Sequence, residues 1–328
     1  MNIGTYQDVL AHIREARTIL LTTHRKADGD AMGSMLALYL YLTAIGKTVR
    51  RVVQDAVQDN LCFLPEAQQV LRAQGLTGQP DDLALSVDAS DMELLGDAAE
   101  PFFAAGFTIQ IDHHRTNTHF AQLNVVKDTA SSAGVMVYEL LEAAGATITQ
   151  DIATCLYTAM STDTGNFCFG NLDDQVFEYM AVLMRAGLPI VQTARQLHLM
   201  RSREQVMLLG RALNSLQFLE DGRLTMMQLT AQDFAECVAS CEHTERIVNY
   251  ALNLPGVEMC FLVSELPDGI KFGLRSIAPH DVSLVANKHF GGGGHALAAG
   301  CTMQGTLQDC VDIMKNALTR LLNGQWHL

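Results

Sequence analysis

Short apolar runs alternate with amphipathic segments through the first part of the chain. Four runs are too brief for helices and apolar enough for strands buried on both faces of a sheet: Thr18–Thr23, Val49–Gln54, Leu83–Val87 and Thr108–Ile111. Longer stretches carry apolar residues at helical spacing: Ala31–Ile45, Ser131–Ala144, Ile152–Met160 and Val176–Ala186. Because alternating strands and helices build parallel sheets, residues 1–190 are predicted to form a doubly wound α/β domain with a mainly parallel sheet.

The pattern changes after this point. Residues 191–219 have helical periodicity and are predicted to be a helical linker. A smaller α+β domain is predicted over residues 220–328, with an antiparallel sheet, because Pro267-Asp268-Gly269 is a hairpin turn signal between two apolar runs. Its expected strands and helices are Leu224–Leu229, Thr244–Leu252, Glu258–Ser264, Ile270–Ile277, Asp281–Lys288 and Leu307–Leu322.

Composition and charge restrict the class of protein. The 328 residues include 22 Lys and Arg against 36 Asp and Glu, a formal net charge of −14, which argues against a protein that coats long duplex nucleic acid. The N-terminus has no signal-peptide pattern, and the chain has no apolar run long enough to cross a bilayer. Its 8 cysteines form no CxxC pair, as in free thiols of a reducing compartment. We therefore expect a cytoplasmic protein without membrane partners.

Aspartate and histidine gather where the predicted strands of the first domain end. His24, Asp28 and Asp30 follow the first strand, whereas Asp88 and the Asp112-His113-His114 triplet follow two later strands. Asp163, in the segment Ser161–Phe167, is expected at a further strand end. The carboxyl ends of strands in a doubly wound sheet line one crevice, so these groups are expected to converge. Any one of these aspartates, taken alone, is more typical of a helix N-cap or a turn.

Carboxylates crowded at one sheet edge repel each other unless cations offset their charge. Oxygen ligands mixed with imidazole suit Mn(II), Mg(II), Fe(II) or Zn(II). His24, Asp28 and Asp30 lie on one loop and could contact two ions, with Asp88 placed to bridge them. A pair of ions supplies a nucleophile and holds phosphoryl oxygens, so the pattern indicates a phosphoester or phosphoanhydride hydrolase.

The second domain carries two candidate anion sites. Gly291-Gly292-Gly293-Gly294-His295 would let backbone N–H groups approach a phosphate, and the imidazole would add a donor. A flexible linker is the alternative, although the apolar residues that follow are typical of packed structure. Arg275, on a predicted strand, is the other candidate. An ordinary exposed arginine without a binding role explains it equally well.

These segments resemble the DHH phosphoesterase superfamily, named for the triplet found here at Asp112–His114. The family's first motif, His-x-x-x-Asp-x-Asp-x-x-Gly-Ser, matches residues 24–34, with Ala27 where proline is frequent. Asp88 matches the second motif, the triplet with Asn117 the third, and Asp163 the fourth.

This resemblance implies roles for the matched residues. It assigns one metal to His24, Asp28 and Asp88. The second metal would be held by Asp30, Asp88, His113 and Asp163. Asp112 would orient the metal ligands without binding a metal itself. His114 would face the substrate phosphate as a hydrogen-bond donor or general acid. The implied cofactors are two divalent ions, Mn(II) first, with Mg(II), Co(II) or Fe(II) as alternatives.

The C-terminal segments resemble the substrate-binding domain of NrnA-type oligoribonucleases. In that group the domains face each other across a cleft, and an arginine and a glycine-rich loop hold the substrate, here Arg275 and Gly292, Gly293, Gly294 and His295. The implied activity degrades short RNA or DNA oligonucleotides and linear dinucleotides to mononucleotides. Removal of phosphate from 3′-phosphoadenosine 5′-phosphate (pAp) is a further expected activity, and a homodimer is left open.

Two other functions compete with this interpretation. An inorganic pyrophosphatase or exopolyphosphatase could share the metal domain, although such a relative typically has a different C-terminal domain, rich in Arg and Lys. A nucleotide-binding regulatory module is the non-enzymatic alternative. The presence of all six predicted metal ligands counts against it.

Overall fold

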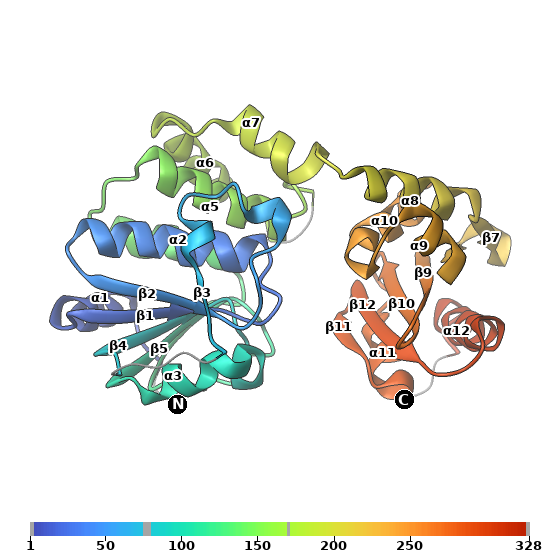
Figure 1. Ribbon diagram of the computed structural model, residues 1–328, viewed down its shortest axis with the longest axis horizontal. Coiled ribbons are helices and arrows are strands. Elements are labelled where there is room, and N and C mark those ends of the chain that lie inside the picture. The colour runs from blue at the N-terminus through green and yellow to red at the C-terminus, as the bar shows by residue number, and fades with distance from the viewer. Residues whose placement is uncertain (1–2, 75–79, 169–170, 326–328) are drawn as a thin grey trace. The chain divides into compact units, whose positions relative to one another are not determined.

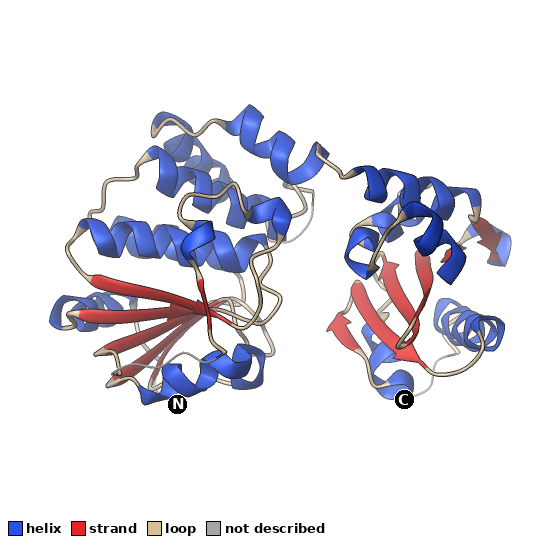
Figure 2. Ribbon diagram, in the orientation of Figure 1, coloured by secondary structure: helices blue, strands red, loops and turns tan. Residues whose placement is uncertain are grey.

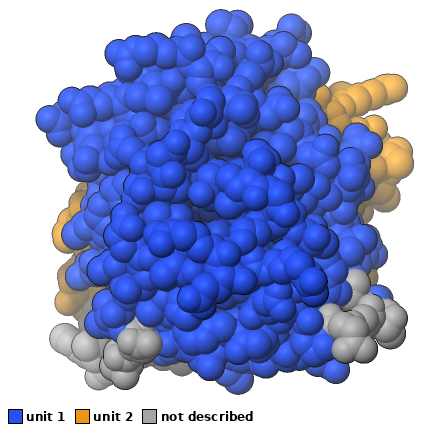
Figure 3. Space-filling view, turned by 90° about the vertical axis from the view of Figure 1, so that its left-hand side faces the viewer, with its two compact units in different colours: residues 1–200 blue, residues 201–328 orange. Residues whose placement is uncertain are grey.

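A computed structural model describes residues 3–74, 80–168 and 171–325 of the chain. The chain divides into two compact units, residues 1–200 and 201–328 (Figures 1 and 3). No helix among the described residues is long and apolar enough to cross a membrane.

Unit 1 is built on a parallel sheet in the order β3-β2-β1-β4-β5-β6. The strands are β1 (Thr18–Thr22), β2 (Thr48–Val53), β3 (Leu71–Arg72), β4 (Leu83–Val87), β5 (Phe107–Asp112) and β6 (Leu123–Val126). The strand order reverses between β1 and β4. In open parallel sheets, ligands bind beyond the carboxyl ends of the strands at such a point. The predicted doubly wound, parallel α/β fold is therefore confirmed.

Helices cover both faces of this sheet (Figure 2). They are α1 (Tyr6–Glu15), α2 (Gly29–Ala44), α3 (Ala99–Ala104), α4 (Ala133–Ala143), α5 (Gln150–Asp163), α6 (Asp174–Arg185) and α7 (Ile190–Ala194). Ile19 and Leu21 of β1 face the larger core, to which α1, α2, α4, α5 and α6 contribute, while Leu20 faces a smaller core with Phe102 of α3. Alternate strand residues thus supply two cores, as expected of a sheet buried on both sides.

Helices α2 and α5 pack closely because the α2 sequence supplies glycine at the contact. A Cβ added to Gly33 would lie 2.4 Å from the carbonyl oxygen of Cys155 on α5. Such an approach is far shorter than van der Waals contact, so a larger residue would push the helices apart. Both helices carry predicted metal-site residues, so this packing also fixes where those residues lie.

Unit 2 has a mixed sheet in the order β11-β12-β10-β9-β8-β7. The strands are β7 (Gln217–Leu219), β8 (Leu224–Leu229), β9 (Met259–Leu266), β10 (Gly269–Ser276), β11 (Gly293–His295) and β12 (Ala298–Met303). Helices α8 (Arg203–Asn214), α9 (Ala231–Cys237) and α10 (Ile247–Leu252) pack on one face, and α11 (Ser283–Phe290) and α12 (Leu307–Leu322) pack on the other. The predicted smaller α+β domain is confirmed, as is the hairpin joining β9 to β10.

One local prediction was wrong. The sheet is not wholly antiparallel, because α9 and α10 carry the chain back from the end of β8 so that β9 pairs with it in parallel. The stretch 191–219, predicted as a helical linker, contains α7 residues, α8 and the short strand β7. It breaks after a π-helical turn at Arg195–Leu199, and α8 begins where Ser202 and Gln205 form a reciprocal capping box.

Candidate metal centre

The loop after β1 brings His24 and Asp28 to the edge of the sheet. Asp28 is the N-cap of α2, and its Oδ1 accepts hydrogen bonds from the N–H groups of Asp30 at 3.0 Å and Ala31 at 3.1 Å. The same oxygen lies 3.8 Å from His24 Nε2. Helix capping therefore accounts for the place of Asp28 and leaves its carboxylate beside the imidazole.

Asp30 is buried in the first turn of α2, where a second helix holds it. Its carboxylate accepts hydrogen bonds from the N–H groups of Ala133 at 2.7 Å and Gly134 at 2.9 Å, at the N-terminus of α4. Ser34 Oγ donates a third at 3.1 Å. A helix N-terminus favours negative charge, but burial raises the pKa of Asp30 well above its usual range, and the charges of Asp88 and Asp163 add to this.

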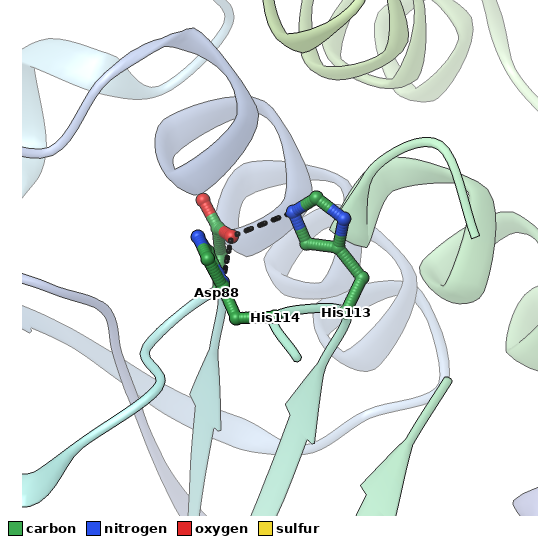
Figure 4. Close-up of side chains that lie close together, drawn as sticks. All are labelled: Asp88, His113 and His114. Carbon is green, nitrogen blue, oxygen red and sulfur yellow. Dashed lines mark ion pairs between the residues drawn. The ribbon is translucent and has the colours of Figure 1, made fainter. Parts of the chain in front are cut away.

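Asp88 lies directly after β4 and forms ion-pair contacts with His113 and His114 (Figure 4). Its Oδ2 is 3.6 Å from His24 Nε2, and its Oδ1 is 3.5 Å from His113 Nε2. Among the described residues, buried Oδ1 has no hydrogen-bond partner. Burial opposes ionisation of Asp88, but His113 and His24 outweigh it and hold the pKa of this carboxyl well below its usual range.

His113 connects Asp88 to two further carboxylates. Its Nε2 lies 3.7 Å from Asp30 Oδ2 and 3.5 Å from Asp163 Oδ2. Its Nδ1 is 3.3 Å from the carbonyl oxygen of Ala130, so Nδ1–H can donate there and leave the Nε2 lone pair directed at the carboxylates. Asp163 lies at the end of helix α5 and not at a strand end as predicted, and its partial removal from water raises its pKa to about 6.

These atoms fit divalent cations. Among the described residues, three groups have ligand atoms within 4.8 Å of one another: His24, Asp28 and Asp88; Asp30, His113 and Asp163; and Asp88, His113 and His114. Crowded carboxylates and imidazoles are a donor set that divalent ions prefer. A bound ion would also give the buried, unpartnered Asp88 Oδ1 a partner. The structure thus brings together all six residues that were predicted to bind metal.

Cation affinity should rise with pH. Burial lowers the pKa of His24, but the nearby Asp28 and Asp88 outweigh this effect and raise the pKa to about 11. In the same way, burial lowers the pKa of His113, but Asp88, Asp30 and Asp163 raise it to about 10. A cation must displace these protons, so the apparent Kd should fall roughly tenfold per pH unit for each proton released. Mn(II) calorimetry at two pH values, in buffers of different ionisation enthalpy, measures both quantities. A pH-independent affinity without proton release would contradict the assignment.

Asp112, His114 and Asn117 form a separate hydrogen-bonded group beside this cluster. Asp112 is fully buried, and its Oδ1 lies 2.8 Å from His114 Nδ1. Asn117 Nδ2 donates to the other oxygen of Asp112. Burial lowers the pKa of His114, but Asp112 and Asp88 outweigh it and raise it above the ordinary value. Asp112 therefore contacts His114 directly, and its role in orienting the site stays a prediction.

The candidate anion residues of unit 2 lie in register on neighbouring strands. Arg275 of β10 is directly opposite Ala298 of β12, which in turn is opposite His295 of β11. Arg275 is half-buried, and no carboxylate in the described part of the chain forms an ion pair with it. Two residues away on the same face, Gly273 has open space where a Cβ would point. The side chain of His295 lies outside the described structure.

The glycines of this segment serve packing as well as backbone exposure. A Cβ at Gly292 would lie 2.1 Å from the carbonyl oxygen of Gly300, and one at Gly294 would lie 2.4 Å from that of Ala298. Gly293 is roomier, with Asn287 Oδ1 at 3.7 Å. Gly293 and Gly294 belong to β11, so the segment is strand in part and not a loop throughout.

Comparisons with known proteins identify the family of this chain. The family model "DHH family, N-terminal domain" matches residues 18–160, and the DHHA1 domain matches residues 237–323. A bifunctional oligoribonuclease and PAP phosphatase, NrnA, of Thermus thermophilus is 31% identical over 88% of this chain and 84% of its own length. The NrnA of Bacillus subtilis is 25% identical over 87% of this chain and 89% of its own.

A solved structure also covers both units. An exopolyphosphatase-related protein of Bacteroides fragilis has a TM-score of 0.92 at 25% identity, over 96% of this chain and 95% of its own. The fold and the site define a phosphoesterase of the metal-dependent α/β type. The chain belongs to the DHH family, with the DHHA1 domain and with NrnA proteins among its relatives.

Sequence reasoning did not find every group that holds the site. The α4 N–H groups that bind Asp30 come from Ala133 and Gly134, whose side chains carry no chemistry. The signal for them was Ser132, which accepts from Val135 N and begins the helix. Gln110, in the middle of a buried strand, was also missed.

Proposed function

We propose that this chain is a two-metal phosphohydrolase that degrades very short oligonucleotides and linear dinucleotides to mononucleotides and also removes a phosphate from pAp. The central position of Asp88, between His24 on one side and His113 on the other, is the observation that carries the proposal. The names of the Thermus thermophilus and Bacillus subtilis relatives support the substrate class.

The ligand assignment follows the clusters. His24, Asp28 and Asp88 would hold one ion, and Asp30, Asp88, His113 and Asp163 would hold the other. Ions at such a site lower the pKa of water and offset charge on phosphoryl oxygens. We assign Mn(II) as the preferred ion, because mixed oxygen and imidazole donors suit it, with Mg(II), Co(II) or Fe(II) as substitutes.

His114 and Asp112 would serve the leaving group. A general acid must hold a proton in the resting state, and the raised pKa of His114 favours this. Asp112 fixes the Nδ1 edge of the ring at 2.8 Å and would stabilise its positive charge. His114 would then donate a proton to the departing sugar oxygen, and Asn117 would keep Asp112 in place.

Arg275, His295 and Gly292–Gly294 are proposed to bind the remote part of the substrate. Arg275 is half-buried without an acidic partner among the described residues, so it suits a phosphate group. The open space beside Gly273 would accommodate the neighbouring nucleobase. Gly293 has room where a Cβ would point, with Asn287 Oδ1 at 3.7 Å, and its backbone is proposed to contact the phosphate.

Loss of Arg275 should therefore depend on the substrate. Arg275→Ala removes a charge-assisted contact of about 1.5–3 kcal/mol, so kcat/KM for a dinucleotide or pAp should fall roughly 10- to 150-fold. Bis-p-nitrophenyl phosphate, which has no remote group to hold, should be spared. His295→Ala should act in the same direction. Equal losses on both substrates would show that these residues support folding or the metal centre instead of specificity.

A phosphoanhydride hydrolase is the second candidate. It is favoured by the likeness to the Bacteroides fragilis protein, which is described as exopolyphosphatase-related. The same metal centre could cleave a phosphoanhydride, so the choice depends on how unit 2 recognises the remainder of the substrate.

A further inference from the structure

One strand beneath the metal centre contains a polar residue that the reaction does not explain. Gln110 of β5 is fully buried between Ile109 and Ile111. It lies in register with Ser86 of β4, which in turn lies opposite Thr22 of β1. Burying an amide is unfavourable unless hydrogen bonds replace those lost to water, so a glutamine here calls for a specific partner.

That partner is the turn that contains Asp88. Gln110 Nε2 donates a hydrogen bond of 2.6 Å to the carbonyl oxygen of Ala89. The next residue of β5, Ile111, accepts a hydrogen bond of 3.0 Å from the N–H of Asp88. Two consecutive residues of β5 therefore hold the N–H group of Asp88 and the carbonyl group of the next residue, Ala89.

This turn needs to be held because its conformation is unfavourable. Asp88 has φ of +56°, in the left-handed region that residues with a Cβ adopt at a cost. Such a residue relaxes unless its surroundings fix it. A relaxed turn would rotate the Asp88 carboxylate, whose oxygens lie 3.6 Å from His24 Nε2 and 3.5 Å from His113 Nε2.

We propose that Gln110 is a positioning residue, which keeps the Asp88 carboxylate between the two predicted metal positions through its hydrogen bond to Ala89. This inference rests on the proposed function, in which Asp88 bridges two ions. Gln110 touches neither substrate nor metal. It links the end of β4 to β5, the strand that ends in Asp112 and leads to His113, and so sets the distance between the central carboxylate and its imidazole neighbour.

The neighbouring polar residues provide a matched control. Thr22 Oγ1 and Ser86 Oγ, like Gln110 Oε1, are fully buried and have no hydrogen-bond partner within the described ranges. They share the row with Gln110 but not its hydrogen bond to the turn. Thr22→Val removes a buried hydroxyl of similar shape, and Gln110→Met removes the amide with little change in length.

The test measures Mn(II) affinity by calorimetry, the spin-coupled Mn(II) signal by electron paramagnetic resonance, and kcat/KM on a dinucleotide. Gln110→Met should weaken Mn(II) binding or turnover about 10- to 100-fold, as expected for residues that orient metal ligands. Gln110→Asn, whose amide is one carbon too short to reach Ala89, should show the same loss if the methionine variant does not fold. Thr22→Val should match the wild type in affinity and turnover.

Three results would overturn the inference. Wild-type Mn(II) affinity and turnover in a folded Gln110 variant would show that the hydrogen bond is not needed. An equal loss in Thr22→Val would show that any change in this buried row disturbs the site. A loss of thermal stability without any change in Mn(II) affinity or turnover would assign Gln110 a purely structural role. Failure of the proposed function is seen separately, as a wild-type protein that binds Mn(II) but does not cleave the dinucleotide.

Discussion

Replacing Asp88 with alanine should lower kcat/KM on a dinucleotide by about 10³-fold or more while the fold survives. Asp88 lies next to both His24 and His113, so its loss removes a ligand from both predicted metal positions at once. Weaker binding of the ions also leaves the carboxylates of Asp30 and Asp163 with less positive charge nearby. Bound manganese should fall below two ions per chain, which elemental analysis of the purified variant measures.

Two further variants separate charge from backbone strain. Asp88→Asn keeps a side chain that tolerates the left-handed conformation at φ of +56° and removes only the charge, so it should be nearly as inactive as the alanine variant. Asp91→Ala removes a carboxylate of the same loop, one that caps a helical turn through Glu93 N at 2.8 Å, and should retain activity. Near-normal Mn(II)-dependent turnover by a folded Asp88→Ala protein would refute the two-metal assignment.

His114→Ala should reduce turnover by about 10²- to 10⁴-fold without loss of bound metal. The imidazole is held by Asp112 at 2.8 Å and is expected to act beside the reacting phosphorus. Turnover of both a dinucleotide and bis-p-nitrophenyl phosphate should fall. Turnover of the dinucleotide should fall further, because its sugar alkoxide is a poor leaving group that needs a proton from the acid.

The pH profile tests the same role. If His114 is the acid, the variant should lose the alkaline limb of the kcat profile that the wild type shows as the imidazole loses its proton. Asp112→Asn should lower activity in the same direction, because it weakens the contact that raises the His114 pKa. An unchanged alkaline limb in His114→Ala would assign the proton donor to another group.

The fold of unit 1 could be predicted largely because its strands are short apolar runs that end in polar residues. Leu83–Val87 was predicted to the residue, and β1 and β5 within one residue at each end. Their strong burial on both faces makes such strands easy to recognise. The short edge strands β3 and β6 were missed, since a two-residue strand and the run LNVV carry too little pattern.

The candidate site was predictable where its chemistry lies in side chains at strand ends. His24, Asp88 and Asp112–His114 converge because parallel strands end at one edge of the sheet. The groups that hold them could not be predicted in the same way. Ala133 and Gly134 act through backbone N–H groups, and the Ala130 carbonyl that orients His113 comes from a distant loop. These contacts depend on packing between segments far apart in the sequence.

Unit 2 was harder to predict because its connections decide its topology. The hairpin turn at residues 267–269 identified an antiparallel pair, but nothing in the pattern of β8 or β9 shows that helices return the chain for parallel pairing. The four successive glycines were interpreted as a phosphate-binding loop. The structure adds that Gly292 and Gly294 are also required by close contact with β12.

The most direct test is a Mn(II)-supplemented assay that presents a 5′-phosphorylated dinucleotide, pAp and inorganic pyrophosphate side by side to the full chain. We predict that the dinucleotide is converted to mononucleotides and that pAp loses a phosphate. Pyrophosphate should be a poor substrate, and a chelator should abolish both reactions. Hydrolysis of pyrophosphate alone, with the dinucleotide and pAp left intact, would contradict the proposed function.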